Sequence, residues 1–336
     1  MVRANGLRVV IVGAGFGGIG AAIELQRHGF DDVTILERAP RLGGTWLRNT
    51  YPNCTCDVPS HLYSFSFAQR RDWSRICSPQ NEILQYLDGV AHAHGVAERV
   101  VTNVDVEACE WNTETFEWTV SGADGRSWQA DAVILATGQL NQPAMPRLQG
   151  AGEFAGHSFH SARWDHTYEL TGKRVAVIGT GASAIQFIPR VAEEAGQLYV
   201  FQRTGNWFLP RRNKPYPWLV RKLIERVPGL QAYRRWFIYQ YAESLTMMIR
   251  HPRTLGRIGQ LVSTLHMRSQ LEDPELRRKA WPDYTFGCKR ILFSSEYLPT
   301  LQRENVELVT EGISRLTAGG IVTEDGVERP ADCVIY

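Results

Sequence analysis

LRVVIVGAGFGG, residues 7–18, is the stretch that decides the fold. The apolar run before Gly13 predicts a buried strand, and the helical spacing of apolar residues after Gly18 predicts a helix. The turn carries Gly13, Gly15 and Gly18, which serve a tight turn, close backbone approach to a pyrophosphate, and close packing of helix on strand. The helix N-terminus then presents unpaired N–H groups to phosphate. We therefore expect a dinucleotide-binding βαβ unit at the start of the chain.

Glu37 supports this interpretation. It follows the next expected strand, residues 33–36, at the offset of roughly 20 residues at which a carboxylate can accept a hydrogen bond from a ribose hydroxyl. A further apolar strand, residues 131–135, leads into Ala136, Thr137 and Gly138. These small residues allow the chain to return close to the nucleotide.

A second glycine turn, residues 179–184, follows the apolar strand 174–178 and opens another helical pattern. Gly179 and Gly181 occupy the first two glycine positions. The third position is taken by Ser183 or Ala184, which such folds tolerate. The chain is therefore expected to contain two nucleotide-binding units in series.

The residue types after the next strand predict which nucleotide the second unit binds. Arg203 and Thr204 follow residues 198–201, at the position where the first unit has Glu37. A cation in place of a carboxylate suits a 2'-phosphate, so NADP is predicted rather than NAD. The alternative is that Arg203 is a solvated residue at a strand end.

Composition excludes several classes of protein. The 336 residues, 43% of them hydrophobic, suffice for two or more domains, and a net charge of +2 disfavours a dedicated nucleic-acid binder. No run reaches the roughly 18 apolar residues of a transmembrane segment, and no secretion signal is present, so a cytoplasmic protein is expected. The six cysteines form neither a disulfide framework nor a zinc spacing, so Cys54 and Cys56 are expected to be reduced thiols and no metal is expected.

The pattern divides the chain into four parts. These are a first dinucleotide-binding domain at 1–146, a linker at 147–171, a second dinucleotide-binding domain at 172–212 and 282–336, and a helical insertion at 213–281. The insertion is expected to hold two or three helices, because apolar residues recur there at helical spacing. The predicted fold class is α/β, with two Rossmann-like domains and a helical insertion in the second.

The end of the sequence repeats an earlier pattern incompletely. Residues 332–336 resemble residues 131–135, but the chain stops before a second Ala-Thr-Gly. We therefore expect a piece of a longer fold, in which the first domain lacks its C-terminal part.

Between the two glycine turns lies FAGHSFHSARWD, residues 154–165. With the two turns around it, this segment resembles the fingerprint F-x-G-x-x-x-H-x-x-x-W-[PD] of the type I Baeyer-Villiger monooxygenases, within the class B flavin-dependent monooxygenases. The resemblance covers nearly the whole chain. The fingerprint positions are filled by Phe154, Gly156, His160, Trp164 and Asp165.

Two further segments extend the resemblance. Gly44, Thr45, Trp46 and Asp57 lie in a segment similar to the one that meets the flavin ring in that family. Lys289 and Arg290 match its active-site lysine and arginine. Considered without the family, Trp46 would be a core residue and Asp57 a turn or cap residue.

The resemblance implies bound FAD and NADP, with O2 and a ketone as small-molecule substrates. Hydride from NADPH reduces the flavin, O2 adds at flavin carbon C4a as a peroxide, and attack on the ketone yields an ester or lactone. Arg290 would stabilise the developing negative charge and Asp57 would orient Arg290. Lys289 would hold the NADP phosphate together with Arg203 and Thr204.

Two fingerprint residues are expected to be structural. His160 could be an acid or base, but a linker histidine is more often a hydrogen-bonding strut, and this role is favoured. Trp164 is expected to pack against neighbours.

Three other classes remain as alternatives. An N- or S-oxygenating flavin monooxygenase would use the same cofactors, although Trp164-Asp165 favours ketone oxygenation. A pyridine-nucleotide disulfide reductase needs a redox-active cysteine pair, which Cys54 and Cys56 do not supply at their spacing. A truncated protein that only binds nucleotide is the third. The sequence specifies neither the ketone nor an oligomeric state.

Overall fold

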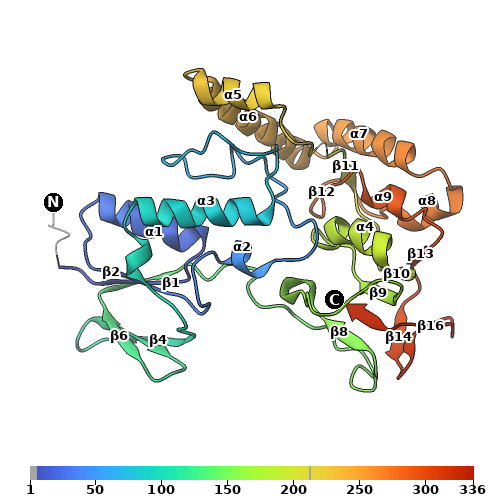
Figure 1. Ribbon diagram of the computed structural model, residues 1–336, viewed down its shortest axis with the longest axis horizontal. Helices are drawn as coiled ribbons and strands as arrows, with labels where there is room; N and C mark the ends of the chain where they lie inside the picture. The colour runs from blue at the N-terminus through green and yellow to red at the C-terminus, as the bar shows by residue number, and fades with distance from the viewer. Residues whose placement is uncertain (1–5, 212) are drawn as a thin grey trace. The chain divides into compact units, whose positions relative to one another are not determined.

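The computed structural model describes residues 6–211 and 213–336, which separate into two compact units (Figure 1). Among the described residues, unit 1 comprises 6–50, 65–70 and 79–143, and unit 2 comprises the remainder. The division differs from the expected boundary, because residues 51–64 and 71–78 belong to unit 2. Hydrogen bonds explain this difference. The amide of Asn213 bonds both the backbone N–H and the carbonyl of Cys77, each at 2.9 Å, and Asn53 donates to the Gln186 carbonyl at 3.2 Å.

Unit 1 is built on a parallel four-stranded sheet. Its elements are β1 (Val9–Val12), α1 (Phe16–Arg27), β2 (Val33–Leu36), α2 (Thr45–Arg48), α3 (Gln80–Ala93), η1 (Ala97–Arg99), β3 (Val100–Val101), β4 (Val106–Asn112), β5 (Glu117–Gly122), β6 (Ser127–Ala130) and β7 (Ala132–Leu135). The sheet order is β3-β2-β1-β7, and the antiparallel sheet β4-β5-β6 packs on it through a core that includes Val10, Leu36 and Val120. Helices α1 and α3 lie on the opposite side of the sheet (Figure 1).

Unit 2 repeats this plan with a parallel five-stranded sheet. Its elements are β8 (His157–Phe159), η2 (Ser161–Arg163), β9 (Arg174–Ile178), α4 (Ala184–Glu194), β10 (Gln197–Phe201), β11 (Phe208–Leu209), α5 (Trp218–Arg226), α6 (Leu230–Arg250), α7 (Leu255–Gln270), α8 (Pro274–Ala280), β12 (Leu292–Phe293), α9 (Tyr297–Thr300), β13 (Val306–Val309), β14 (Ile313–Leu316), β15 (Gly320–Thr323), β16 (Glu328–Pro330) and β17 (Cys333–Ile335). The sheet order is β13-β10-β9-β17-β8.

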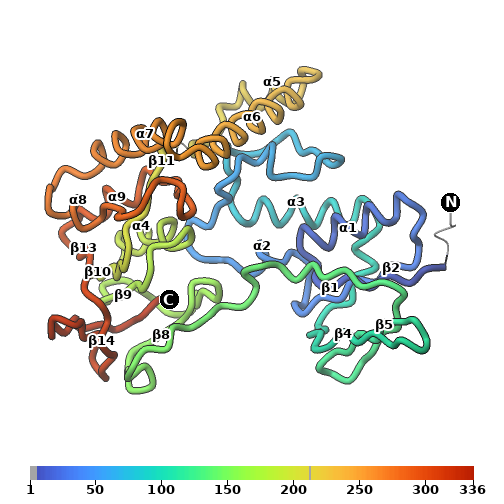
Figure 2. Tube along the Cα trace, turned by 180° about the vertical axis from the view of Figure 1, so that it is seen from behind, coloured from blue at the N-terminus to red at the C-terminus, as the bar shows by residue number. Residues whose placement is uncertain are grey.

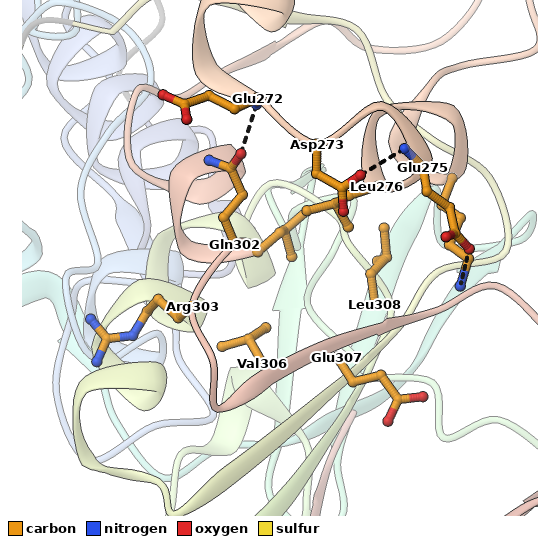
Figure 3. Close-up of a pocket in the computed structure, with 11 residues that line it drawn as sticks. Glu272, Asp273, Glu275, Leu276, Gln302, Arg303, Val306, Glu307 and Leu308 are labelled. Carbon is orange, nitrogen blue, oxygen red and sulfur yellow. Dashed lines mark hydrogen bonds and ion pairs between the residues drawn. The ribbon is translucent and has the colours of Figure 1, made fainter.

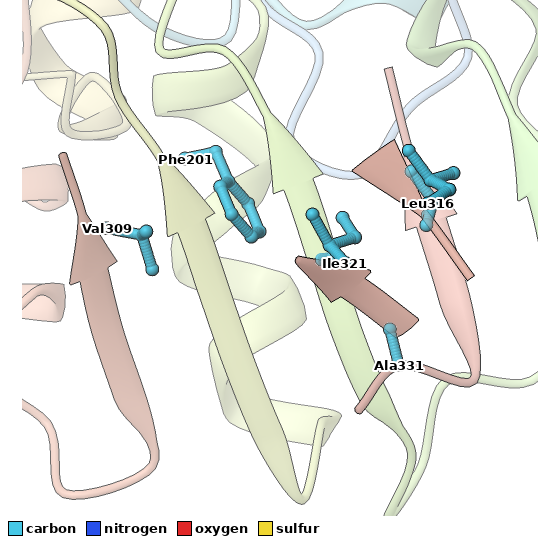
Figure 4. Packing of buried hydrophobic residues seen from close by; sticks show 7 residues of the cluster. Phe201, Val309, Leu316, Ile321 and Ala331 are labelled. Carbon is cyan, nitrogen blue, oxygen red and sulfur yellow. The ribbon is translucent and has the colours of Figure 1, made fainter. Parts of the chain in front are cut away.

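An apolar core lies between this sheet and the antiparallel sheet β14-β15-β16. Phe201 and Val309 project from the parallel strands toward Leu316 and Ile321 of the small sheet (Figure 4). Ala331, just before β17, closes the cluster. The three short strands therefore cover one face of the nucleotide-type sheet, as β4-β5-β6 does in unit 1.

The segment expected to be a linker contributes to this sheet. Residues 157–159 form β8, the edge strand that pairs in parallel with β17. Gly156 precedes it, and a Cβ there would overlap the Phe154 ring and lie 2.7 Å from the Asp332 carbonyl oxygen. Only glycine therefore allows the chain to enter the sheet beside Phe154.

Each parallel sheet has an Arg–Asp ion pair at the start of its central strand. Arg8 donates from its backbone N–H to Asp131 at 2.7 Å and pairs with it through the guanidinium at 2.9 Å. Arg174 donates from its backbone N–H to Asp332 at 2.8 Å and pairs with it through the guanidinium at 2.6 Å. The similarity between residues 131–135 and 332–336 thus corresponds to equivalent strands, β7 and β17.

The insertion between β11 and β12 contains α5, α6, α7 and α8 (Figure 2). Two or three helices were expected there. The helices α5, α6 and α7 are long enough to show helical spacing in the sequence, whereas α8 has seven residues and is additional. Many large apolar side chains of this insertion are exposed, among them Trp218, Phe237 and Leu265. Along 6–211 and 213–336, no helix combines the length and the apolar character needed to cross a membrane.

Candidate functional site

The first glycine turn is shaped by contacts that exclude side chains. Gly13 has φ of +106°, and a Cβ there would lie 2.5 Å from the Ala136 carbonyl oxygen. A Cβ on Gly18 would overlap the Gly13 carbonyl oxygen. Gly15 caps α1, whose first turn has neither an acidic residue nor a side-chain cap. The N–H groups at the start of α1 therefore suit a pyrophosphate, and the turn fits a dinucleotide such as FAD.

Glu37 is buried beside this turn. Its carboxylate accepts hydrogen bonds from the backbone N–H groups of Ala14 and Ala39, each at 2.8 Å. A carboxylate has about four acceptor positions, so two bonds leave capacity for a ribose hydroxyl. The ribose contact itself stays a prediction.

Two other predicted segments reach the same turn. Gly44 has φ of +53°, and a Cβ there would lie 2.9 Å from the Gly15 Cα, so the residues before α2 pack directly on the turn. Thr45 begins α2 and Trp46 is buried within it. Thr137 and Gly138 follow β7, and the Ala136 N–H donates to the Val12 carbonyl at 2.9 Å, which holds this return segment against the turn.

The second glycine turn joins β9 to α4 and differs in its surroundings. Gly179 has φ of +108° and Ser183 caps α4 without a side-chain hydrogen bond. A Cβ on Gly179 or Gly181 would meet no described atom within 4 Å. The space beside this turn is therefore open to a ligand.

Arg203 and Thr204 line a cavity of about 300 Å³ after β10. Arg203 is exposed, and the carboxylates of Asp283 and Glu311 line the same cavity. Arg278 and Lys279 of α8 line the same cavity. Three cations and these two carboxylates thus line one hollow, so the cations outnumber the carboxylates by one. The guanidinium of Arg203 could donate charge-assisted hydrogen bonds to a phosphate there. In the sequence, only the basic run 277–279 could have indicated the two α8 cations, and its distance along the chain from Arg203 hides their proximity.

Lys289 is not among the residues that line this cavity. Its Nζ lies over the Tyr284 ring, 4.5 Å from the ring centroid. The expected contact of Lys289 with the NADP phosphate stays a prediction.

A larger hollow of about 540 Å³ lies between α8 and β13. Figure 3 shows carboxylates around it, with Asp273 capping α8 through a 2.8 Å bond from the Glu275 N–H. Glu272 donates its backbone N–H to the Gln302 side chain at 2.7 Å. The carboxylates of Glu272, Asp273, Glu275 and Glu307 outnumber the cations Lys279 and Arg303 in its lining, so this hollow is less favourable to phosphate than the Arg203 cavity.

Asp57 and Arg290 come together in unit 2. An Arg290 Nη2–Asp57 Oδ2 distance of 3.2 Å joins them, with the carboxylate side chain 14% exposed and the guanidinium 66% exposed. Burial raises the pKa of Asp57, and the charges of Arg211 and Arg290 oppose that rise. Gln186 donates to the other carboxylate oxygen at 3.0 Å. The structure thus shows the predicted pair, while its catalytic role stays a prediction.

Gln186 was not expected from the sequence. This buried α4 residue donates to Thr55 and Asp57 through Nε2, and its Oε1 accepts from the Thr55 N–H at 3.1 Å. It thereby ties the helix of the second glycine turn to the carboxylate. No local pattern marks it, because its partners lie more than 120 residues away.

The fingerprint residues build structure around β8. The His160 Nδ1 accepts from the Ala162 N–H at 3.0 Å, and burial lowers the pKa of His160, which suits the strut role. Trp164 packs edge-on against Phe159 and Phe187, each with ring centroids 5.1 Å apart. Asp165 accepts from Thr167 and lies 2.9 Å from the His157 Nε2. None of these contacts requires a ligand.

The cysteines do not form a redox pair. Cys54 and Cys56 are both free and buried. Burial raises the pKa of Cys54 to about 11 and that of Cys56 to about 12, so thiolates are disfavoured. This arrangement does not support disulfide-reductase chemistry.

Comparison with known proteins identifies relatives over nearly the whole chain. The sequence profile of the pyridine nucleotide-disulphide oxidoreductases matches residues 10–245. A Baeyer-Villiger monooxygenase of Streptomyces coelicolor is 43% identical over 98% of this chain and 63% of its own length. One from Pseudomonas aeruginosa is 42% identical over 98% and 62%. The chain thus spans less than two thirds of these relatives.

Solved structures are similar over almost the whole chain. An oxidised steroid monooxygenase bound to NADP superposes with a TM-score of 0.85 and 30% identity, covering 98% of this chain and 71% of the other. OTEMO in complex with FAD and NADP gives a TM-score of 0.83 and 29% identity, covering 98% and 71%.

Proposed function

We propose that this chain, which belongs to the Baeyer-Villiger monooxygenase family, supplies the FAD- and NADP-binding parts of an enzyme that inserts one oxygen atom of O2 into a ketone to give an ester or lactone. NADPH would supply the two electrons that reduce the second oxygen atom to water. The observation that carries the proposal is the Arg290–Asp57 pair at 3.2 Å in a unit that also holds an open NADP-type turn. Relatives of this name and structures with FAD and NADP support it.

Unit 1 is proposed to hold FAD. The α1 N-terminus would bind the pyrophosphate and Glu37 a ribose hydroxyl, because both groups face the same glycine turn. Thr45, Trp46 and Thr137 would lie along the cofactor. FAD, when bound, supplies the redox chemistry that couples NADPH oxidation to O2 activation.

Unit 2 is proposed to hold NADP and the charge-stabilising group. Arg203 with Thr204, helped by Arg278 and Lys279, would bind the 2'-phosphate, since all line one cavity. The exposed guanidinium of Arg290 would donate to the oxygen on which negative charge develops. Asp57 would fix its direction.

The visible absorption spectrum of the purified chain tests the proposal. FAD bands should appear after incubation with FAD, bleach when NADPH is added, and return under air. A panel of ketones analysed by gas chromatography should then yield esters or lactones. Failure to retain FAD would contradict the proposal for this chain. Turnover of amines or sulfides with inert ketones would favour the N- or S-oxygenating alternative.

A further inference from the structure

Arg211 is a second guanidinium beside Asp57. It follows β11, and its Nη1 lies 3.7 Å from the Asp57 Oδ1, with both side chains 14% exposed. Its Nη2 donates to the Thr55 Oγ1 at 2.7 Å and to the Cys56 carbonyl at 2.6 Å. The backbone N–H of Arg211 donates to Ser295 at 3.0 Å. The guanidinium is therefore held by the two residues that precede Asp57.

The two arginines at Asp57 occupy different environments. Arg290 contacts the Oδ2 atom and is 66% exposed, so it is available to a ligand. The side chain of Arg211 is largely buried, at 14% exposed, and its Nη2 already donates to Thr55 and Cys56. A buried charge interacts more strongly than an exposed one, because water and salt screen it less.

The remaining groups around Asp57 contribute no formal charge. Gln186 donates a neutral amide hydrogen bond. Burial raises the pKa of each other titratable neighbour and keeps it neutral; these neighbours are Tyr51, Cys54, Cys56 and Cys77. Of the groups that shift the Asp57 pKa, Arg211 and Arg290 are the charged ones, and both oppose the rise caused by burial.

We propose that Arg211 is a positioning residue, whose buried guanidinium is the permanent counter-charge that holds the Asp57 carboxylate ionised and in place, so that Asp57 can orient Arg290. A carboxylate supported only by the exposed Arg290 would be weakly stabilised whenever that guanidinium turned to a ligand. The consequence for catalysis rests on the proposed function, whereas the carboxylate's support is a property of the chain without cofactors.

Titration of Asp57 in the unloaded chain tests the proposal. The chain is labelled with 13C at the aspartate carboxyls, and Asp57→Asn identifies the signal. Arg211→Met should raise the Asp57 pKa by about one to three units, the usual effect of a charge at this distance. Arg211→Lys should raise it less, because the ammonium keeps the charge but loses the fork geometry. Arg290→Ala should also raise it less than Arg211→Met, because its guanidinium is exposed.

Arg190→Met is the matched control. Arg190 lies on α4 and pairs with Glu193 and Glu296. Its removal should leave the Asp57 titration unchanged. An Asp57 pKa that moves no further in Arg211→Met than in Arg190→Met would overturn the proposal.

A folding failure would still be informative. If Arg211→Met does not fold because it leaves the Asp57 charge uncompensated, adding Asp57→Asn should restore folding, as judged by circular dichroism. A double variant that also fails to fold would show that Arg211 acts independently of Asp57, against the proposal.

The loaded enzyme provides a separate readout. In Arg211→Met, the acid limb of the kcat–pH profile should move to higher pH while the KM for NADPH changes little, because Asp57 must be ionised to orient Arg290. If the unmodified chain does not oxygenate ketones, the proposed function would be refuted, but the titration of Asp57 would still test the role of Arg211. If the chain is active but the Asp57 pKa does not change in Arg211→Met, only the proposed role of Arg211 would be refuted.

Discussion

Asp57 and Arg290 are 233 residues apart in the sequence, yet their side chains meet at 3.2 Å. The carboxylate is buried and the guanidinium is not, so one residue is fixed and the other remains accessible. This asymmetry suits an arginine that must reach a reacting oxygen while the Asp57 carboxylate orients its guanidinium.

Replacing Arg290 with alanine should separate reduction from oxygenation. In the FAD-loaded chain, Arg290→Ala should leave bleaching by NADPH nearly unchanged and lower ester formation roughly 10²- to 10³-fold, because a fixed donor to the developing charge is lost. Stopped-flow absorbance and gas chromatography measure the two steps. Arg190→Ala serves as the control, and undiminished ester formation in Arg290→Ala would refute the role.

Arg203 should matter for NADPH and not for NADH. Arg203→Ala removes charge-assisted hydrogen bonds to a 2'-phosphate, at a cost of about 1.5–3 kcal/mol in NADPH binding. NADH has no such phosphate. Isothermal titration calorimetry of both nucleotides measures the difference, with the exposed Arg315→Ala as the control. Equal weakening of the two nucleotides would count against the NADP assignment.

At the scale of elements, neighbouring glycines of α1 differ in how much space a side chain would have beside the first glycine turn. A Cβ on Gly18 would overlap the Gly13 carbonyl oxygen, whereas one on Gly17 would lie 3.6 Å from the Ala136 Cβ, an ordinary contact. Adjacent glycines therefore have different tasks. Gly18 permits close packing of α1 on β1, and Gly17 is not needed for it.

This contrast predicts the effect of adding one methyl group. Gly18→Ala should destabilise unit 1 by about 1–3 kcal/mol and abolish FAD retention, because the turn must shift. Gly17→Ala should be neutral or stabilising by up to about 1 kcal/mol, because alanine favours the helix. Thermal unfolding and the flavin absorbance of each variant measure this. Similar losses in both variants would contradict the assigned geometry.

At the scale of the whole molecule, each unit has its own sheet, its own core and its own Arg–Asp ion pair. Arg174 lowers the pKa of Asp332 to about 2, and Arg8 lowers the pKa of Asp131. A carboxyl with a lowered folded-state pKa stabilises the fold above its unfolded value, near 4, and this stabilisation is lost as pH falls toward 2. The effect should be small, because both pairs are partly exposed.

The acid sensitivity should be local. The free energy of unfolding, measured with urea, should fall less between pH 5 and pH 2 in Asp332→Asn than in the unmodified chain. Hydrogen exchange should quicken in β9 and β17 and not in β1 or β7. Asp31→Asn removes an exposed carboxylate instead, and this variant should keep the acid-side loss. Faster hydrogen exchange in the strands of both units of Asp332→Asn would contradict a local effect.

The elements nearest the glycine turns were predictable. The strand expected at 174–178 is β9, and the one expected at 33–36 is β2, because short apolar runs bounded by turns show a buried parallel strand directly. By contrast, the sequence of β8 predicts part of a linker. Its three residues show no apolar pattern, and only pairing with β17 makes them a strand.

The sequence by itself determined the two nucleotide turns, the α/β class and the family, because backbone conformation at glycine and the alternation of strand and helix are local properties of the chain. Tertiary structure alone decided the surroundings of Asp57. Gln186, Arg211 and Arg290 reach it from segments 129 to 233 residues away. Such contacts follow from how strands are ordered and helices packed, and no spacing along the chain encodes them. Tertiary structure likewise placed Arg278 and Lys279 beside Arg203, because α8 folds back toward the end of β10.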